Sequence, residues 1–111
     1  MARIAGIILR AGDRKVTAKF YANLGLNESE HQHDGPVHHE IGPLTDKSIV
    51  EVYQASQKYG LDALMIEVNS IEVALKRVSI FEALSVTESG GIRFTYIHDP
   101  DGRPVMLIEK M

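Results

Sequence analysis

The chain has 111 residues, of which 44% are hydrophobic and 24% charged, and this size and composition predict one small globular domain. Its net charge is -3 and its 12 basic residues are dispersed, which argues against nucleic acid as a partner. The absence of cysteine excludes disulfides and thiolate zinc sites, and no apolar run is long enough to span a membrane. We therefore expect a soluble cytoplasmic protein.

The chain opens with a predicted strand and a predicted helix. Residues 4–9 are apolar and rich in β-branched side chains, which favours a strand, and Asp13 is a candidate N-cap for the helix that follows. Apolar side chains then repeat every four residues, at Val16, Phe20 and Leu24. Gly25 can end the helix in a left-handed cap, so we predict an amphipathic helix of about three turns.

Three further strands are predicted in the first half of the chain. Residues 27–35 are polar and indicate an exposed edge strand or a loop. Residues 37–41 and 48–54 are strand-like and flank a connection at 42–47 with turn residues at its start and its end, which predicts a hairpin. Successive side chains of a strand point to opposite faces, so Glu51 lies opposite the valine face of its strand.

After a linker at residues 56–60 the same order begins again. Residues 64–68 predict a strand, and Asn69 with Glu72 forms a box-like cap for a second helix. An apolar stripe marks that helix at Ile71, Leu75 and Val78. Three more strands are predicted at residues 82–87, 92–98 and 105–109. The chain therefore reads βαβββ twice.

The last two strands flank a strong turn sequence, Asp99-Pro100-Asp101-Gly102, which predicts a closing hairpin. One helix per module and strands of alternating pattern predict helices on one face of mixed sheets. We predict an α+β fold in which two βαβββ modules form a cup-shaped mixed sheet with the helices on the outer face. The single domain is residues 1–111, with modules of about 1–55 and 61–111.

Two motifs resemble the vicinal oxygen chelate superfamily, which includes glyoxalase I, bleomycin-resistance proteins and extradiol dioxygenases. Phe20-Tyr21-Ala22-Asn23-Leu24-Gly25-Leu26 is similar to its "FY…LGL" segment, and Asp99-Pro100-Asp101-Gly102 before a strand is similar to its closing hairpin. With the doubled βαβββ order, the resemblance spans nearly the whole chain. It implies a glyoxalase/bleomycin resistance-like fold and, since small relatives generally dimerise, a homodimer.

The resemblance also implies where a metal would bind. Metal-dependent relatives place one ligand, usually His or Glu, on each of four strands facing the cup. By motif spacing these positions fall here on Gly6, Glu51, Ala63 and Met106. Only Glu51 can bind a divalent ion, whereas a catalytic metal site needs about three protein ligands. We therefore expect no cofactor, and a closer likeness to the metal-free relatives of the bleomycin-resistance type.

Other polar residues leave an alternative open. His38 and Glu40 can point into the cup beside Glu51, so a noncanonical site that binds a divalent metal through these three residues is conceivable. His31 and His33 lie in the polar segment, and we expect them to be exposed. A carboxylate among apolar neighbours is partly desolvated, which raises its pKa and suits Glu51 to act as a general base.

Three functional hypotheses follow. The first is a metal-free protein that binds a small organic ligand and sequesters it, an antibiotic for example. That ligand would contact His38, Glu40, Tyr53, Met65 and Met106. The alternative is a glyoxalase-like lyase or isomerase, or a dioxygenase-like enzyme, that uses Glu51 as its catalytic base or uses the noncanonical metal site. The third is a structural dimer module whose cup is filled, because the two methionines suit an ordinary core equally well.

Overall fold

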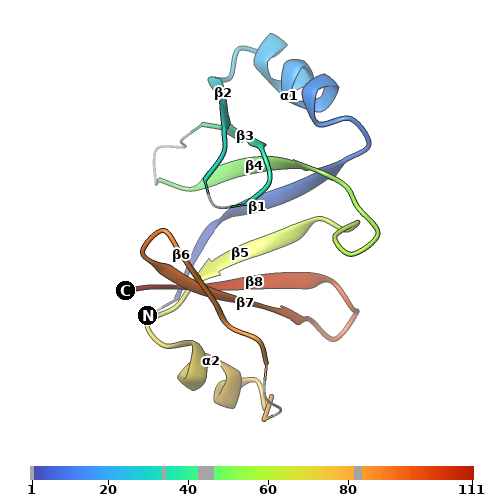
Figure 1. The fold of residues 1–111 in the computed structure, drawn as a ribbon. Helices are drawn as coiled ribbons and strands as arrows, with labels where there is room; N and C mark the ends of the chain where they lie inside the picture. Colours follow the sequence, from blue (N-terminus) through green and yellow to red (C-terminus); the bar gives the residue numbers. More distant parts are fainter. Residues whose placement is uncertain (1, 34, 43–46, 82–83) are drawn as a thin grey trace.

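The computed structural model describes residues 2–33, 35–42, 47–81 and 84–111, and Figure 1 shows its fold. The elements of the first half are β1 (Arg3–Ala11), α1 (Arg14–Asn23), β2 (Glu28–His31), β3 (His38–Ile41) and β4 (Ile49–Gln54). Those of the second half are β5 (Ala63–Glu67), α2 (Ile71–Arg77), β6 (Thr87–Ser89), β7 (Ile92–His98) and β8 (Pro104–Lys110). The predicted order βαβββ therefore occurs twice.

All of these strands belong to one mixed sheet of eight, in the order β2-β3-β4-β1-β5-β8-β7-β6. The two modules meet at its centre, where β1 and β5 are antiparallel. Each first strand is parallel to the last strand of its own module, β1 to β4 and β5 to β8. The predicted hairpins β3–β4 and β7–β8 are both present, so the α+β fold class is confirmed.

The alternation of side chains gives the sheet two different faces. One face, which we call the cup face, has a buried cluster of Ile8, Ala63 and Met65. The opposite face, which we call the outer face, has a second cluster of Ala11, Ile41 and Val52 near α1. In Figure 1, α1 lies beside the β2–β4 end of the sheet and α2 beside the β5–β8 end.

The helix α1 begins and ends as the sequence predicts, but its apolar repeat does not face the sheet. The Asp13 side chain accepts hydrogen bonds from two backbone N–H groups of the first turn, and Gly25 takes a φ of +102°. The buried residue of α1 is Ala18, 2% exposed, whose small side chain allows a close approach to the sheet. The apolar residues at the predicted spacing are exposed: Val16 66%, Phe20 59% and Leu24 67%.

The second helix is capped by a different residue from the one predicted. The N-cap is Ser70, not Asn69: Ser70 has extended backbone, and its Oγ accepts a hydrogen bond of 3.2 Å from the Val73 N–H. The carboxylate of Glu109 on β8 accepts a further bond of 2.8 Å from the Ile71 N–H. These two acceptors satisfy donors that would otherwise be unpaired at the helix start.

The strand predicted at 82–87 begins later than expected. Residues 82–83, like residues 43–46 of the predicted 42–47 connection, lie outside the described residues. The observed β6 pairs with the start of β7 across Gly90 and Gly91, whose φ angles are +58° and +83°. Because this turn is only two residues long, the end of β6 must lie directly opposite the start of β7, and this fixes the register of the pair. At the other edge, β2 is an exposed edge strand, as predicted.

The closing hairpin has the predicted turn chemistry. The Asp99 carboxylate accepts bonds of 2.9 Å from the N–H groups of Asp101 and Arg103, and Gly102 has a φ of +86°. The resulting register places Met106 opposite Tyr96.

At the far end of β8, Glu67 of β5 pairs with Arg3 at 3.2 Å and with Lys110 at 3.5 Å. Across the described ranges, the structure contains no helix that is both long and apolar enough to span a bilayer.

Candidate ligand site on the cup face

Polar side chains of β3 and β4 converge on the cup face because of the strand register. His38 lies opposite Tyr53, and Glu40 lies opposite Glu51. The His38 Nε2 atom is 3.1 Å from a Glu40 carboxylate oxygen and 3.6 Å from a Glu51 carboxylate oxygen. The structure thus brings together His38, Glu40 and Glu51, as strand alternation predicts, and the ring of His38 is only 3% exposed.

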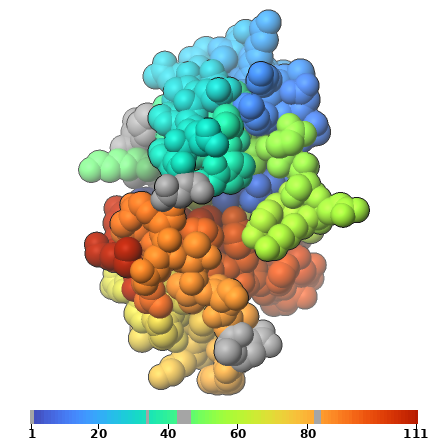
Figure 2. Space-filling view, in the orientation of Figure 1, coloured from blue at the N-terminus to red at the C-terminus, as the bar shows by residue number. Residues whose placement is uncertain are grey.

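Two further histidines reach this cluster from β2 and the residues after it. The Nε2 atoms of His31 and His33 lie 3.6 and 3.5 Å from the Glu40 carboxylate. His33 is exposed, as expected, with a side-chain exposure of 64%, whereas His31 is half-buried, with a side-chain exposure of 37%. Their orientation toward Glu40 was not predicted from the sequence. In Figure 2, the β2–β3 segment (teal) and the segment at β6 (orange) lie on the same face of the molecule.

The two carboxylates of the cluster are perturbed in opposite directions. Burial raises the pKa of Glu51, and the charge of Glu40 adds to this effect while the His38 charge opposes it. Burial would also raise the pKa of Glu40, but hydrogen bonds from His38 and His33 and the charge of His31 outweigh it and lower that pKa. Glu51 is therefore the carboxylate that binds a proton more readily, as a general base must.

Beside the cluster, Arg10 lies among three tyrosines. The Arg10 guanidinium carbon is 4.7 Å from the ring centroid of Tyr53 and 5.0 Å from that of Tyr59. A guanidinium N–H donates to the Tyr96 hydroxyl at 3.5 Å. Among the described residues, no carboxylate oxygen lies within ion-pair distance of this guanidinium. On its other side Tyr53 stacks on His38, with ring centroids 4.7 Å apart.

Sequence reasoning singled out Tyr53 but missed the role of its neighbours. Arg10 continues the alternation that begins at Ile8 in β1, and the register of β7 on β8 brings Tyr96 to Met106, so both positions were readable from strand alternation. Tyr59 lies in the linker between the modules, where no periodicity indicates the direction of a side chain. The tyrosine and arginine cluster could therefore be predicted only in part.

The methionines predicted to line the cup differ in their burial. Met65 is 3% exposed and packs with Ile8 and Ala63 in the cluster at the centre of the sheet. Met106 is half-buried and packs against that cluster from β8. Met65 thus forms the floor of the cup face, and Met106 is the methionine that a bound molecule can contact.

The metal position implied by the superfamily does not fit this chain. A Cβ atom added at Gly6 would lie 1.9 Å from the Ile49 carbonyl oxygen, and Gly6 has a φ of +152°. No ligating side chain can therefore occupy that position without moving the backbone. Ala63 is buried and has no donor atom, and a thioether such as that of Met106 suits soft Cu(I) and not Zn²⁺ or Mg²⁺. Glu51 alone remains, which is too few ligands.

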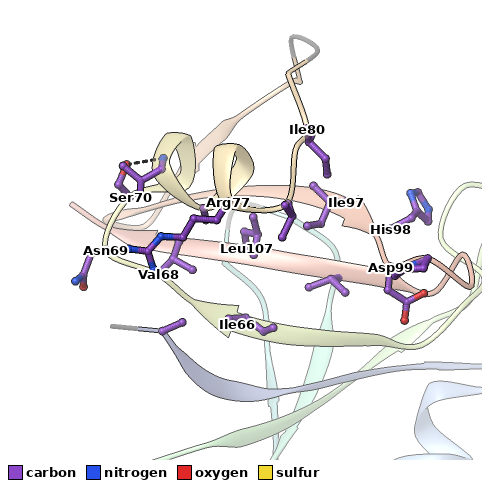
Figure 3. A pocket seen from close by; sticks show the side chains of 16 residues that line it. Ile66, Val68, Asn69, Ser70, Arg77, Ile80, Ile97, His98, Asp99 and Leu107 are labelled. Carbon is purple, nitrogen blue, oxygen red and sulfur yellow. Dashed lines mark hydrogen bonds between the residues drawn. The ribbon is translucent and has the colours of Figure 1, made fainter.

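A cavity lies on the outer face, away from this chemistry. It has a volume of about 730 Å³ and separates α2 from β5, β7 and β8 (Figure 3). Its walls are mostly apolar and include Ile66, Val78, Ile97 and Leu107, with Arg77 and His98 among the few polar residues. The converging polar groups lie on the cup face, so we take the cup face, not this cavity, as the candidate functional site.

Comparison with known proteins rests on structure alone, since no family model and no curated protein matches the sequence. A glyoxalase/bleomycin resistance protein/dioxygenase superfamily member from Vibrio splendidus 12B01 matches with a TM-score of 0.63, 16% identity and 100% coverage of both chains. The chain has the fold of this superfamily. A hypothetical protein from Bacillus halodurans C-125 also matches, with a TM-score of 0.71, 18% identity and coverages of 99% and 95%.

Enzymes are also among the matches to the glyoxalase-like fold. Methylmalonyl-CoA epimerase from Mycobacterium tuberculosis matches with a TM-score of 0.64 and 16% identity, over 96% of this chain and 85% of that one. A catechol 2,3-dioxygenase matches with a TM-score of 0.61 and 16% identity, but this chain spans only 39% of its length. Identities this low show the shared fold, and the function must be argued from the site.

Proposed function

We propose that the protein binds a small organic molecule on the cup face and that this binding requires no metal ion. The observation that carries the proposal is the Arg10 guanidinium, which lies over the rings of Tyr53 and Tyr59 with no carboxylate oxygen within ion-pair distance among the described residues. An oriented cation beside aromatic faces can bind a ligand that has both a negative group and an apolar body. The misfit at Gly6 supports a site that works without the superfamily's metal.

The expected ligand is an aromatic or amphipathic carboxylate, and an antibiotic with these groups belongs to that class. Its carboxylate would pair with Arg10, whose planar donors match two carboxylate oxygens. Its apolar part would contact Tyr96 and Met106, which face each other across β7 and β8. His38 and Glu40 border the same face and would contact polar groups of the ligand. A hydrogen bond to a charged group contributes about 1.5–3 kcal/mol, so Arg10 accounts for roughly a 10- to 150-fold change in affinity.

The test starts from protein purified without a histidine tag and kept in EDTA. Native mass spectrometry identifies any molecule that copurifies, and thermal shift screening against aromatic carboxylates and antibiotics finds further binders. We expect Arg10→Met to weaken binding at least tenfold. Lys58→Met is the matched control, because Lys58 also lies over the Tyr59 ring, at 5.3 Å, but from the exposed side. Binding that vanishes in EDTA, or that both variants weaken equally, contradicts the proposal.

A second candidate function, proton transfer, is favoured by Glu51. Its carboxylate lies on the cup face and its pKa is raised mainly by burial, two properties of a general base. In this version the protein is a lyase or isomerase that removes a proton next to a carbonyl of the bound molecule. Solvent deuterium exchange into an identified ligand, followed by NMR, would show such chemistry, and Glu51→Gln should abolish it while the ligand still binds. A ligand that binds but exchanges no deuterium leaves sequestration as the function.

We also propose that the protein is a homodimer. The exposed apolar residues of α1, Val16, Phe20 and Leu24, form a stripe that a second copy could cover. Sedimentation equilibrium should give a dimer for the wild-type chain and a monomer for Phe20→Glu. Lys15→Glu, on the same helix but outside the stripe, is the control and should remain dimeric. A monomeric wild-type protein at micromolar concentration contradicts the proposal.

A further inference from the structure

We propose that the protein binds a divalent transition-metal ion through His31, His33, His38 and Glu40, at a site distinct from the superfamily's metal position. This site, which we call the rim site, lies on β2, β3 and the residues that join them. Glu51 lies next to it on β4, and the rim site shares His38 and Glu40 with the ligand site. The proposal concerns the ion alone and does not depend on the identity of an organic ligand.

The distances from the histidine nitrogens to the Glu40 carboxylate are close to those between two ligands of one metal ion. Zinc is bound by imidazole nitrogen at about 2.0–2.1 Å, so two ligand atoms of a tetrahedral site lie about 3.3 Å apart. The three histidine Nε2 atoms lie 3.6, 3.5 and 3.1 Å from Glu40 carboxylate oxygens, for His31, His33 and His38 respectively. Two overlapping groups, His31–His33–Glu40 and His38–Glu40–Glu51, each keep their ligand atoms within 4.8 Å of one another. An ion at Glu40 therefore needs only small side-chain rotations to reach these donors.

The position of His38 resembles that of a metal ligand with a fixed tautomer. Its Nδ1 atom is 3.4 Å from the Pro36 carbonyl oxygen, which can only accept a hydrogen bond. A proton on Nδ1 leaves the lone pair of Nε2 directed at the carboxylates of Glu40 and Glu51. In this tautomer Nε2 can ligate an ion placed between the two carboxylates, whereas with the proton on Nε2 His38 donates a hydrogen bond to Glu40 instead. Ligating histidines usually donate their second N–H to a carbonyl or carboxylate in this way.

Strand register explains why these residues meet, and exposure explains how an ion enters. His31 pairs directly with His38, and Ser29 pairs with Glu40, across β2 and β3. His38 forms the buried wall, whereas His33, with its side chain 64% exposed, forms the open side. The Ser29 hydroxyl lies 2.8 Å from the His31 Nε2 atom and has to turn away when His31 coordinates. The open side lets an ion enter and leaves room for water as a fifth ligand.

The donor set selects the kind of ion. Imidazole nitrogens with one carboxylate suit Zn²⁺, Ni²⁺ or Cu²⁺, whereas Mg²⁺ and Ca²⁺ prefer oxygen donors. A purely structural reading of the cluster is that the histidines form only hydrogen bonds with Glu40. The two readings differ in one measurable property, which is stoichiometric and saturable binding of a transition metal.

The experiment titrates Zn²⁺ into tag-free protein that has been treated with chelator and then freed of it, using isothermal titration calorimetry. Metal content after equilibrium dialysis is measured in parallel. We expect one ion per chain for the wild type. The double variant His31→Gln/His33→Gln changes one half-buried and one exposed side chain, so it should fold normally and lose at least tenfold in affinity. Glu40→Gln should lose at least as much.

The control is His98→Gln, because His98 is an exposed histidine at the end of β7, outside the cluster. Its Zn²⁺ affinity should equal that of the wild type. Replacing Zn²⁺ by Mg²⁺ in the same titration should give no heat of binding. The proposal is overturned if the wild type binds no stoichiometric Zn²⁺, if the double variant binds as tightly as the wild type, or if His98→Gln loses as much affinity as the double variant.

Discussion

Gly6 provides the sharpest test of the structure because its substitution combines two separate costs. In Gly6→Ala, the new Cβ atom would lie 1.9 Å from the Ile49 carbonyl oxygen, a backbone atom that can move only with β4. The φ of +152° adds conformational strain of about 1–3 kcal/mol for a residue with a side chain. Displacing packed neighbours costs about another 1–3 kcal/mol. Gly6→Ala should therefore lower the free energy of unfolding by about 2–6 kcal/mol, out of the roughly 5–15 kcal/mol of a typical domain.

Two other glycines separate these costs in the same assay, which is urea unfolding followed by circular dichroism. Gly25→Ala has a positive φ of +102° but open space around the added atom, so it should show the strain without the collision. Gly12→Ala has neither and should change stability by less than about 0.5 kcal/mol. In thermal unfolding, Gly6→Ala should lower Tm by about 10–25 °C. Equal stabilities of the Gly6→Ala and Gly25→Ala variants would contradict the close approach of β1 and β4 at Gly6.

Two further predictions concern α2 and the closing hairpin. Ile71→Ala removes a side chain that is 1% exposed and should cost about 2–5 kcal/mol in urea unfolding, whereas Val73→Ala, at a site 49% exposed, should cost much less. Hydrogen bonds from the Arg103 and Asp101 backbone hold the pKa of Asp99 below its usual range, so this carboxylate stabilises the fold above the unfolded pKa of about 3.9. The Tm advantage of the wild type over Asp99→Asn should thus shrink as the pH falls below about 4, and an advantage that persists at pH 2 contradicts this reasoning.

The strands and their faces were predictable because alternation in a strand has a period of exactly two. That period placed His38, Glu40 and Glu51 on one face, and the turn at Asp99-Pro100-Asp101-Gly102 fixed the register of Met106. The capping residue of a helix was harder to predict from the local sequence. Asn69 and Ser70 are both good N-caps, and the backbone conformation selected the second.

The face of α1 and the outer part of the site were not predictable from local sequence. A repeat of four residues marks one side of a helix, but in the structure the small Ala18 packs against the sheet and Phe20 is exposed. His33 follows the end of β2, and Tyr59 lies in the linker, so the direction of neither side chain can be predicted from strand or helix periodicity. Their positions depend on tertiary packing, which brings Tyr59 over Arg10 and His33 to Glu40.

The ion pairs of Glu67 have a consequence for how the chain can be connected. Arg3 of β1 and Ile108 of β8 flank Glu67 in neighbouring strands, so two strand spacings, or about 10 Å, separate the start of the first strand from the end of the last. Figure 1 shows the start of β1 and the end of β8 at the same side of the sheet. A short peptide could join them, and the linker near Tyr59 could be opened to create new ends. Such a circular permutant would contain the second module before the first, yet the order of strands in the sheet would be unchanged.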